Sequence, residues 1–173
     1  MYFYFLKNKF KKNNQASALT MNSRVYGNFK LGILGGGQLG RMLIQEAVNY
    51  NIHVCVMDGD AHAPCKHIAN EFTLGSLVDF DAVYNFGKKV DLLTIEIEHV
   101  NIDALEQLEK EGLKVYPQPA VLRIIKDKGL QKQFYQQHNI PTAPFHLINN
   151  KAELNKFTPS FPLIQKTRTA GYD

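Results

Sequence analysis

The segment KLGILGGGQLGR, residues 30–41, joins a short apolar run to a glycine-rich turn and then to a helical pattern. The first five residues are typical of a buried strand, and Gly35-x-Gly37-x-x-Gly40 follows without a spacer. From 41 to 50, apolar side chains recur at helical spacing. Such a turn lets a phosphate group approach the backbone amides of a helix N-terminus. A tight turn without a ligand is the alternative.

The same alternation continues along the chain. We expect strands at 52–57, 71–74, 91–96 and 113–116, and helices at 65–69, 80–89 and 102–111. Gly112 stands where a helix commonly ends. Strands alternating with helices form parallel βαβ units with right-handed crossovers. The sequence therefore predicts an α/β fold, a doubly wound parallel sheet with helices on both faces.

The pattern changes after Pro117. Helices are expected at 119–125 and 128–138, a strand at 161–166, and a loop of small residues to the end of the chain. A strand and loop with nothing to cover them suggest a second domain of which only the beginning is present. We expect a first domain over 29–126 and the start of a truncated second domain over 127–173.

The positive charge is concentrated near the N-terminus. Of the 20 basic side chains, five lie in residues 1–29, a stretch without an acid, and the remainder of the chain is close to neutral. A surface that follows a nucleic acid backbone is therefore not expected. Residues 1–28 are interpreted as a disordered extension, or as translation from a start upstream of a true start at Met21.

Composition excludes several other classes of protein. The chain has 173 residues, is 45% hydrophobic, and has only two cysteines, Cys55 and Cys65. No apolar run approaches the roughly 18 residues that a membrane-spanning helix needs. The six histidines show no zinc-ligand spacing. We expect a cytoplasmic protein without a disulfide framework, a membrane segment or a metal site in this chain.

Three acidic side chains follow predicted strands. Asp58 comes 18 residues after Gly40, which extends the glycine motif to a dinucleotide fingerprint and by itself favours NAD. Glu96 and Glu98 are two residues apart, so an extended strand would point both to one face beside the glycine turn. A ligand with a phosphate at one end and hydroxyls or an amine at the other would satisfy the turn and both carboxylates. A solvated surface pair is the alternative.

Lys166 and Arg168 lead into the run Thr169-Ala170-Gly171-Tyr172-Asp173. A basic residue on a strand before a mobile glycine loop is a common way to hold triphosphate oxygens. The lysine precedes the glycine, so the spacing differs from that of a P-loop, and a charged end of a terminal strand is equally compatible with the pattern.

Five stretches taken together resemble the 5-(carboxyamino)imidazole ribonucleotide synthases, ATP-grasp ligases of purine biosynthesis. The resemblance runs in order through residues 30–173 and is carried by GGGQLGRM at 35–42, TIEIEHVN at 94–101, DKGLQK at 127–132, IPTAP at 140–144 and QKTRTAGYD at 165–173. It implies that the first domain is a Rossmann-like pre-ATP-grasp domain that holds a ribonucleotide and not NAD.

The resemblance also implies the reaction. Enzymes of this family use ATP and bicarbonate to carboxylate the exocyclic amine of 5-aminoimidazole ribonucleotide, with carboxyphosphate as an intermediate. They need Mg²⁺, whose acidic ligands are expected outside these residues, and they are often homodimers. By itself this chain is expected to bind ATP poorly and to lack ligase activity.

Residue roles follow by position in the matching motifs. The amides of Gly37, Gln38 and Leu39 would hold the substrate 5′-phosphate. Glu96 would bind the ribose or amine end, with Glu98 nearby. The residues expected to bind ATP are Lys128, Lys166, Gly171, Tyr172 and Asp173.

Two departures from the family pattern keep alternatives open. Ala170 replaces a glycine of the family's loop, and Lys128 stands where arginine is frequent. Another ATP-grasp enzyme, such as the formate-dependent glycinamide ribonucleotide transformylase, shares the glycine turn and the paired glutamates. A non-catalytic NAD-binding module is the alternative from a different class.

Overall fold

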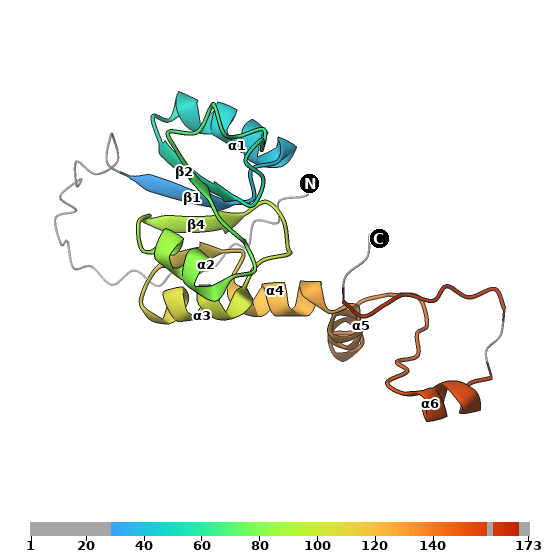
Figure 1. The fold of residues 1–173 in the computed structure, drawn as a ribbon. Helices are drawn as coiled ribbons and strands as arrows, with labels where there is room; N and C mark the ends of the chain where they lie inside the picture. The colour runs from blue at the N-terminus through green and yellow to red at the C-terminus, as the bar shows by residue number, and fades with distance from the viewer. Residues whose placement is uncertain (1–28, 159–160, 170–173) are drawn as a thin grey trace, which may run out of the picture.

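The computed structural model describes residues 29–158 and 161–169. A five-stranded parallel sheet, in the order β3-β2-β1-β4-β5, forms its centre (Figure 1). The strands are β1 Lys30–Leu34, β2 His53–Asp58, β3 Glu71–Leu74, β4 Leu92–Ile95 and β5 Lys114–Tyr116. The helices are α1 Gln38–Asn49, α2 Phe80–Gly87, α3 Ile102–Lys110, α4 Pro119–Lys126, α5 Lys128–Gln137 and α6 Lys151–Lys156. The predicted doubly wound α/β fold is confirmed.

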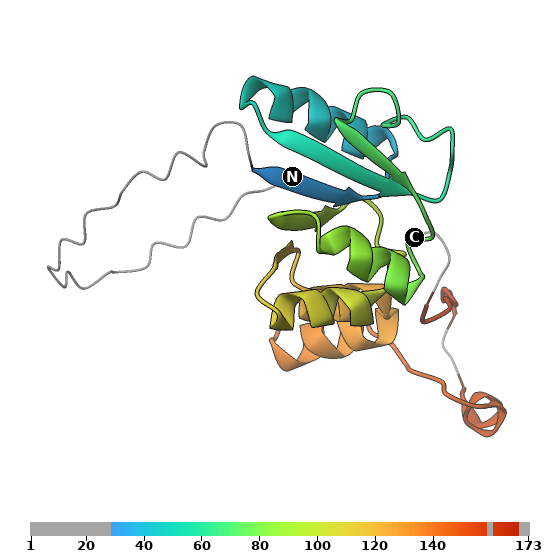
Figure 2. The same cartoon turned by 60° about the vertical axis from the view of Figure 1, so that its left-hand side comes forward.

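Helices cover both faces of the sheet (Figure 2). On one face, Ile44 and Ala47 of α1 pack in a cluster with Ile33 of β1 and Val56 of β2. On the other, α2 and α3 pack against the sheet in a cluster that includes Leu34 and Leu93. Strands buried on both sides need almost continuous apolar sequences, and this is why their sequences do not alternate with polar residues.

The strand order places β1 at the point where the sheet changes direction. The chain moves outward from β1 through β2 to β3, then crosses back by way of α2 to β4 on the other side of β1. In parallel sheets of this kind, ligands bind at the carboxyl ends of the strands where the order reverses. The segments after β1 and β4 therefore lie at the edge of the sheet where ligand binding is expected.

Helix α1 begins earlier than expected. Its first residue is Gln38 rather than residue 41, and the amide of Arg41 donates to the carbonyl of Gly37 at 3.0 Å. Gln38, Leu39 and Gly40 thus form the first helical turn instead of a loop. Glycines disfavour helix interiors but not a helix start, and this explains the difference.

Two predicted elements are wrong. Residues 65–69 form consecutive turns, in which the Ala69 amide donates to the Cys65 carbonyl, because the segment is too short to continue as a helix. The strand predicted at 161–166 does not form. That segment is exposed, Pro162 has no N–H to donate, and no strand among residues 29–158 pairs with it. Helix α6 was not predicted.

Helices α4 and α5 lead away from the sheet. Leu122 anchors α4 in the cluster beneath α3, and Arg123 pairs with Glu106 and Asp103 of α3. Figure 1 shows α5, α6 and the segment after α6 extending beyond the sheet. Within the described part of the chain, none of the helices is long and apolar enough to cross a membrane.

Candidate functional site

The N-terminus of α1 opens at the carboxyl edge of the sheet. Gly37 occupies the N-cap position and, as a glycine, has no side chain that could accept from the first amides of the helix. Gln38 and Leu39 follow in the first turn and are exposed. The first amides of a helix have no partner within the helix and carry its positive dipole end. This terminus can therefore accept an anion such as a phosphate.

The turn before α1 is held by backbone bonds from two other segments. The amide of Gly35 donates to the carbonyl of Met57 at 2.9 Å, and the amide of Gly36 donates to Oδ2 of Asp58 at 2.6 Å. The Gly36 carbonyl accepts from the Cys65 amide at 3.0 Å. Gly35 has a φ of +100°, a conformation that favours glycine.

Glu96 follows β4 and lies against this turn. A Cβ atom at Gly35 would come within 2.8 Å of Oε2 of Glu96, and one at Gly37 within 2.7 Å of Oε1. The Glu96 side chain is half-buried, and no group in residues 29–158 or 161–169 forms a hydrogen bond or ion pair with its carboxylate. The structure thus brings a carboxylate that has no partner among the described residues next to the open helix terminus.

Glu98 is placed differently from Glu96. β4 ends at Ile95 and residues 96–98 bend, so the argument that side chains two apart share a face does not apply to them. Glu98 is exposed, and its carbonyl accepts from the Val100 amide at 2.9 Å. The two glutamates therefore differ in burial, and only Glu96 contacts the glycine turn.

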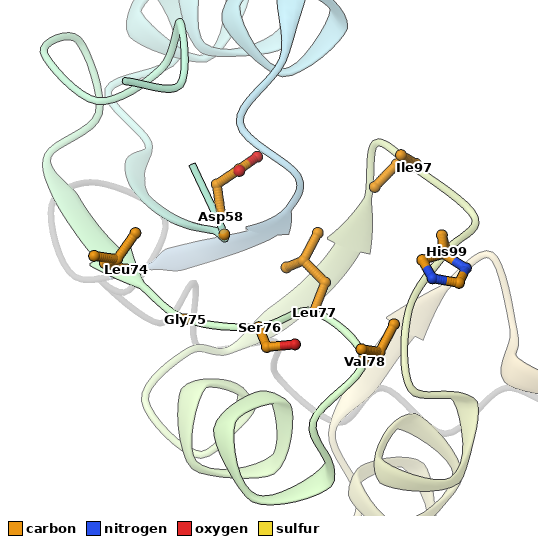
Figure 3. A pocket seen from close by; sticks show the side chains of 9 residues that line it. Asp58, Leu74, Gly75, Ser76, Leu77, Val78, Ile97 and His99 are labelled. Carbon is orange, nitrogen blue, oxygen red and sulfur yellow. The ribbon is translucent and has the colours of Figure 1, made fainter. Parts of the chain in front are cut away.

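A cleft of about 640 Å³ adjoins the turn (Figure 3). Its wall is the β3–α2 segment, which crosses the strand ends because α2 returns the chain from β3 to β4. Asn101 fixes this wall by donating from its amide to the Leu77 carbonyl and from its side chain to the Val78 carbonyl. The lining residues are Asp58, Gly59, Leu74, Gly75, Ser76, Leu77, Val78, Ile97 and His99.

Sequence reasoning missed most of this cleft. Asp58 lines both the cleft and the turn, but Gly37 and Glu96 are not among the lining residues. The long crossover from β3 to β4 was the available signal, since such a connection must pass over the strands between them. The composition of the wall, apolar apart from Ser76, carried no motif.

Cys65 supports the turn from the side of α1. Its buried thiol lies 3.4 Å from the carbonyl of Gly37, and a Cβ at Gly40 would be 3.1 Å from its sulfur. Burial, followed by the nearby carboxylates of Glu96 and Asp58, raises the pKa of the Cys65 thiol. A protonated, buried thiol packs as a small apolar group and is a poor nucleophile.

The lysines predicted to bind ATP lie on two segments that meet. The amide of Lys128, the first residue of α5, donates to the carbonyl of Arg168 at 2.8 Å. The Arg168 guanidinium holds both oxygens of Asp127, at 3.1 Å from Nε and 2.8 Å from the second nitrogen. Lys166 is exposed on the same segment. Gly171, Tyr172 and Asp173 lie outside the described residues.

Asp127, which pairs with Arg168, also caps helix α5. It is the N-cap of α5, and its Oδ1 accepts from the amides of Gly129 and Leu130 at 2.7 and 3.1 Å. The Arg168 side chain, more than the two amides, lowers the pKa of Asp127. One carboxylate thus connects the start of α5 to residues 161–169.

The described residues do not supply a Mg²⁺ site beside these lysines. The group of potential metal ligands found among them is His53, Cys55 and Glu71, toward the amino ends of β2 and β3. Mg²⁺ prefers oxygen ligands, and the ammonium of Lys30 already contacts Glu71 at 2.7 Å. This set of donors does not fit the cation that an ATP-dependent reaction uses.

Comparison with known proteins finds similar sequences in one family of enzymes. Residues 29–126 match the family model described as the ribonucleotide synthetase preATP-grasp domain. The chain is 42% identical over 147 residues to the phosphoribosylaminoimidazole carboxylase of Schizosaccharomyces pombe, covering 83% of this chain and 26% of that protein. It is 32% identical over 145 residues to the N5-carboxyaminoimidazole ribonucleotide synthase of Staphylococcus haemolyticus, covering 83% of this chain and 38% of that protein.

Solved structures show the same likeness. N5-carboxyaminoimidazole ribonucleotide synthetase from Thermotoga maritima matches with a TM-score of 0.75 and 34% identity, over 83% of this chain and 39% of that one. The Aspergillus clavatus enzyme, in complex with ADP and 5-aminoimidazole ribonucleotide, matches with a TM-score of 0.66 and 39% identity, over 74% and 35%. The chain spans about a quarter of the length of the curated fungal relatives, 26% of the first.

Proposed function

Because the chain belongs to the family of ribonucleotide synthetase preATP-grasp domains, we propose that residues 29–126 hold the ribonucleotide substrate of an ATP-dependent ligase of purine biosynthesis. One observation carries this proposal. The uncapped N-terminus of α1 lies beside the carboxylate of Glu96, which has no partner in the described part of the chain, at the edge where the strand order reverses. An anion site next to an acceptor of hydroxyl or amine protons suits a sugar phosphate that carries an amine.

The proposed substrate is 5-aminoimidazole ribonucleotide, the molecule bound in the related Aspergillus clavatus structure. Its 5′-phosphate would accept hydrogen bonds from the amides of Gly37, Gln38 and Leu39. Glu96 would accept from the ribose hydroxyls or from the amine, with Glu98 further out in solvent. The helix N-terminus would bind the phosphate end of the ligand, and a carboxylate would bind the hydroxyl or amine end. The site would therefore determine the orientation of the ligand and also contribute to its affinity.

The proposed reaction carboxylates the exocyclic amine of that substrate. A bicarbonate oxygen attacks the γ-phosphorus of ATP, which releases ADP and forms carboxyphosphate. The amine nitrogen then attacks the carboxyl carbon, phosphate leaves, and the nitrogen loses a proton. Lys128 and Lys166 would hold ATP phosphates on the joined segments described above, with Gly171, Tyr172 and Asp173 closing over them to exclude water from the intermediate.

The remaining proposals concern what accompanies this reaction. ATP is supported by the ADP and ATP complexes of related structures, whereas Mg²⁺, bicarbonate and a homodimer are proposed from family membership. A cytoplasmic location fits the two free cysteines, although a relative from Vigna aconitifolia is named as chloroplastic.

A binding experiment on the 173-residue chain tests the site. We expect 5-aminoimidazole ribonucleotide to shift the backbone amide resonances of Gly37 to Leu39, and Gln38→Pro to weaken binding about tenfold, since proline removes one donor amide while suiting the first helical position. Gln45→Ala, on the exposed side of the same helix, is the control. Unchanged affinity in Gln38→Pro, or shifts with NAD⁺ alone, would contradict the proposal.

A further inference from the structure

Asp58 stands where a dinucleotide-binding domain places its ribose-binding acid. It is the last residue of β2, the strand next to β1, and it follows the glycine motif at the usual distance. In such domains the carboxylate points to the ligand and accepts from a ribose hydroxyl. The glycine motif and Asp58 by themselves therefore fit an NAD-binding domain equally well.

In the structure, both oxygens of this carboxylate are bonded to the backbone. Oδ2 accepts from the Gly36 amide at 2.6 Å, and Oδ1 accepts from the Asp60 amide at 2.7 Å. Figure 3 shows the Asp58 side chain pointing away from Ser76 and Leu77, the far wall of the cleft. The carboxylate is therefore oriented by the glycine turn and by the Asp60 amide, at the edge of the cleft that Asp58 also lines.

The bond to Gly36 joins residues 22 positions apart and completes a closely packed turn. The Gly36 carbonyl accepts from the Cys65 amide. Both the N–H and the C=O of Gly36 are therefore hydrogen-bonded. A Cβ at Gly36 would lie 3.1 Å from Cβ of Ala63 and 3.3 Å from the Asp58 side chain. Because Gly37 is the next residue, the path of the chain into α1 depends on this bond.

We propose that Asp58 is a positioning and specificity residue: it fixes the glycine turn so that the first amides of α1 face a single 5′-phosphate, and two backbone amides hold its carboxylate in an orientation set by the turn and not by the ribose of a dinucleotide. The inference rests on the proposed function, since it names the feature that restricts the site to mononucleotides. A charge-assisted hydrogen bond of this length is among the stronger bonds that a backbone amide can make.

Asp60 provides a matched control in the same loop. Its side chain carries the same charge, is exposed, and among the described residues accepts one bond, from the His62 amide at 2.8 Å, while its backbone carbonyl accepts from the Ala63 amide in the wild type and the variant alike. Asp60→Asn therefore changes the charge of the loop and a short-range turn without touching the glycine turn. Asp58→Asn keeps one acceptor oxygen, and Asp58→Ala keeps none.

Hydrogen exchange, measured on the 173-residue chain, tests whether Asp58 fixes the glycine turn. We expect exchange of the Gly36 amide to accelerate about tenfold or more in Asp58→Ala, less in Asp58→Asn, and not in Asp60→Asn. Equal exchange rates in the wild type and Asp58→Ala would overturn the proposed hold on Gly36. If Asp58→Ala fails to fold, the comparison of Asp58→Asn with Asp60→Asn decides.

Ligand titrations test whether Asp58 contributes to binding of a mononucleotide in preference to a dinucleotide. For 5-aminoimidazole ribonucleotide we expect a dissociation constant about tenfold higher in Asp58→Ala, an intermediate rise in Asp58→Asn, and a change within about twofold in Asp60→Asn. NAD⁺ should not compete on the wild type. Wild-type affinity in Asp58→Ala, or competition by NAD⁺, would overturn the assignment. If the wild type does not bind the ribonucleotide, the proposed function is wrong. The exchange rates of the Gly36 amide still test its hydrogen bond to Asp58 in that case.

Discussion

At the scale of single residues, the glycine motif meets several different demands. Gly35 adopts a left-handed φ of +100°, and Gly37 leaves room for the Glu96 carboxylate. At Gly40, a side chain would meet Cys65 and the carbonyl of Gly35, both at 3.1 Å. The motif therefore serves close packing of a carboxylate and a thiol around the turn as much as the approach of a phosphate.

Gly35→Ala separates backbone strain from this packing. Gly112 has a similar φ, +96°, but nothing lies within 4 Å of a Cβ there. We expect Gly112→Ala to lower the free energy of unfolding by about 1–2 kcal/mol, the cost of a left-handed backbone. Gly35→Ala should cost more, since the new methyl group also meets Glu96. Denaturant unfolding measures both, and equal losses would mean that Glu96 moves aside freely.

At the scale of elements, single carboxylates connect pairs of segments. Asp127 caps α5 and pairs with Arg168, and Glu111 joins the ends of α2 and α3. Gln107 is the main cause that lowers the pKa of Glu111 from its usual 4.5 to about 2, followed by Lys88 and Tyr84. These exposed bonds contribute little to stability individually, but they set how neighbouring elements are joined.

Arg168→Gln should release residues 161–169 without unfolding α5. The variant loses the bidentate ion pair with Asp127, but the cap on Gly129 and Leu130 remains. Trypsin should then cleave after Lys166 faster than in the wild type, with unchanged helical content by circular dichroism. Asp127→Ala should show both faster cleavage and lost helicity, and Arg168→Lys an intermediate rate. Equal cleavage rates in all four proteins would refute a restraint by this pair.

Glu111→Gln should reveal a pH-dependent contribution at the α2–α3 junction. The pKa of Glu111 is lower in the folded state, so its stabilising effect is present above about pH 4.5 and is lost as the pH falls toward 2. The difference in Tm between the wild type and this variant should shrink across that window, and added salt should also reduce it. Glu109→Gln, an exposed position of α3, is the control for the change of charge.

At the scale of the whole molecule, two clusters lie on opposite faces of one sheet. Ile44 belongs to the cluster under α1, and Leu108 belongs to the cluster under α2 and α3; each is nearly fully buried, at 2% and 1% exposed. The sheet separates them, and both depend on it. The packing on one face therefore stabilises the strands that the other face also requires.

Ile44→Ala and Leu108→Ala test whether the two faces act as one cooperative unit. Each should lower the free energy of unfolding by about 2–5 kcal/mol. Because the two side chains share no partners, the double variant should lose the sum of the single losses within about 0.5 kcal/mol. A single denaturant transition with unchanged slope is expected for all variants. Two separate transitions would show that the faces unfold independently.

The amino-acid sequence by itself determined the order and type of most elements and the parallel sheet. Apolar periodicity and glycine turns are local signals, and burial on both faces makes strands such as β2 nearly continuous in apolar residues. The helix predicted at 128–138 is also confirmed, and capping by Asp127 is a local interaction that involves only the next three residues.

Only the tertiary structure decided what the acidic residues do. Asp58 ends β2 and Glu96 follows β4, with similar local sequence signals, yet one carboxylate is bonded to Gly36 and the other has no partner among the described residues. Likewise, Phe161 to Lys166 has a strand-like composition but no neighbouring strand to pair with in the part of the chain that the structure describes. Such outcomes depend on which groups the fold brings within 3 Å, and a hydrogen bond between residues distant along the chain leaves no periodicity in the sequence.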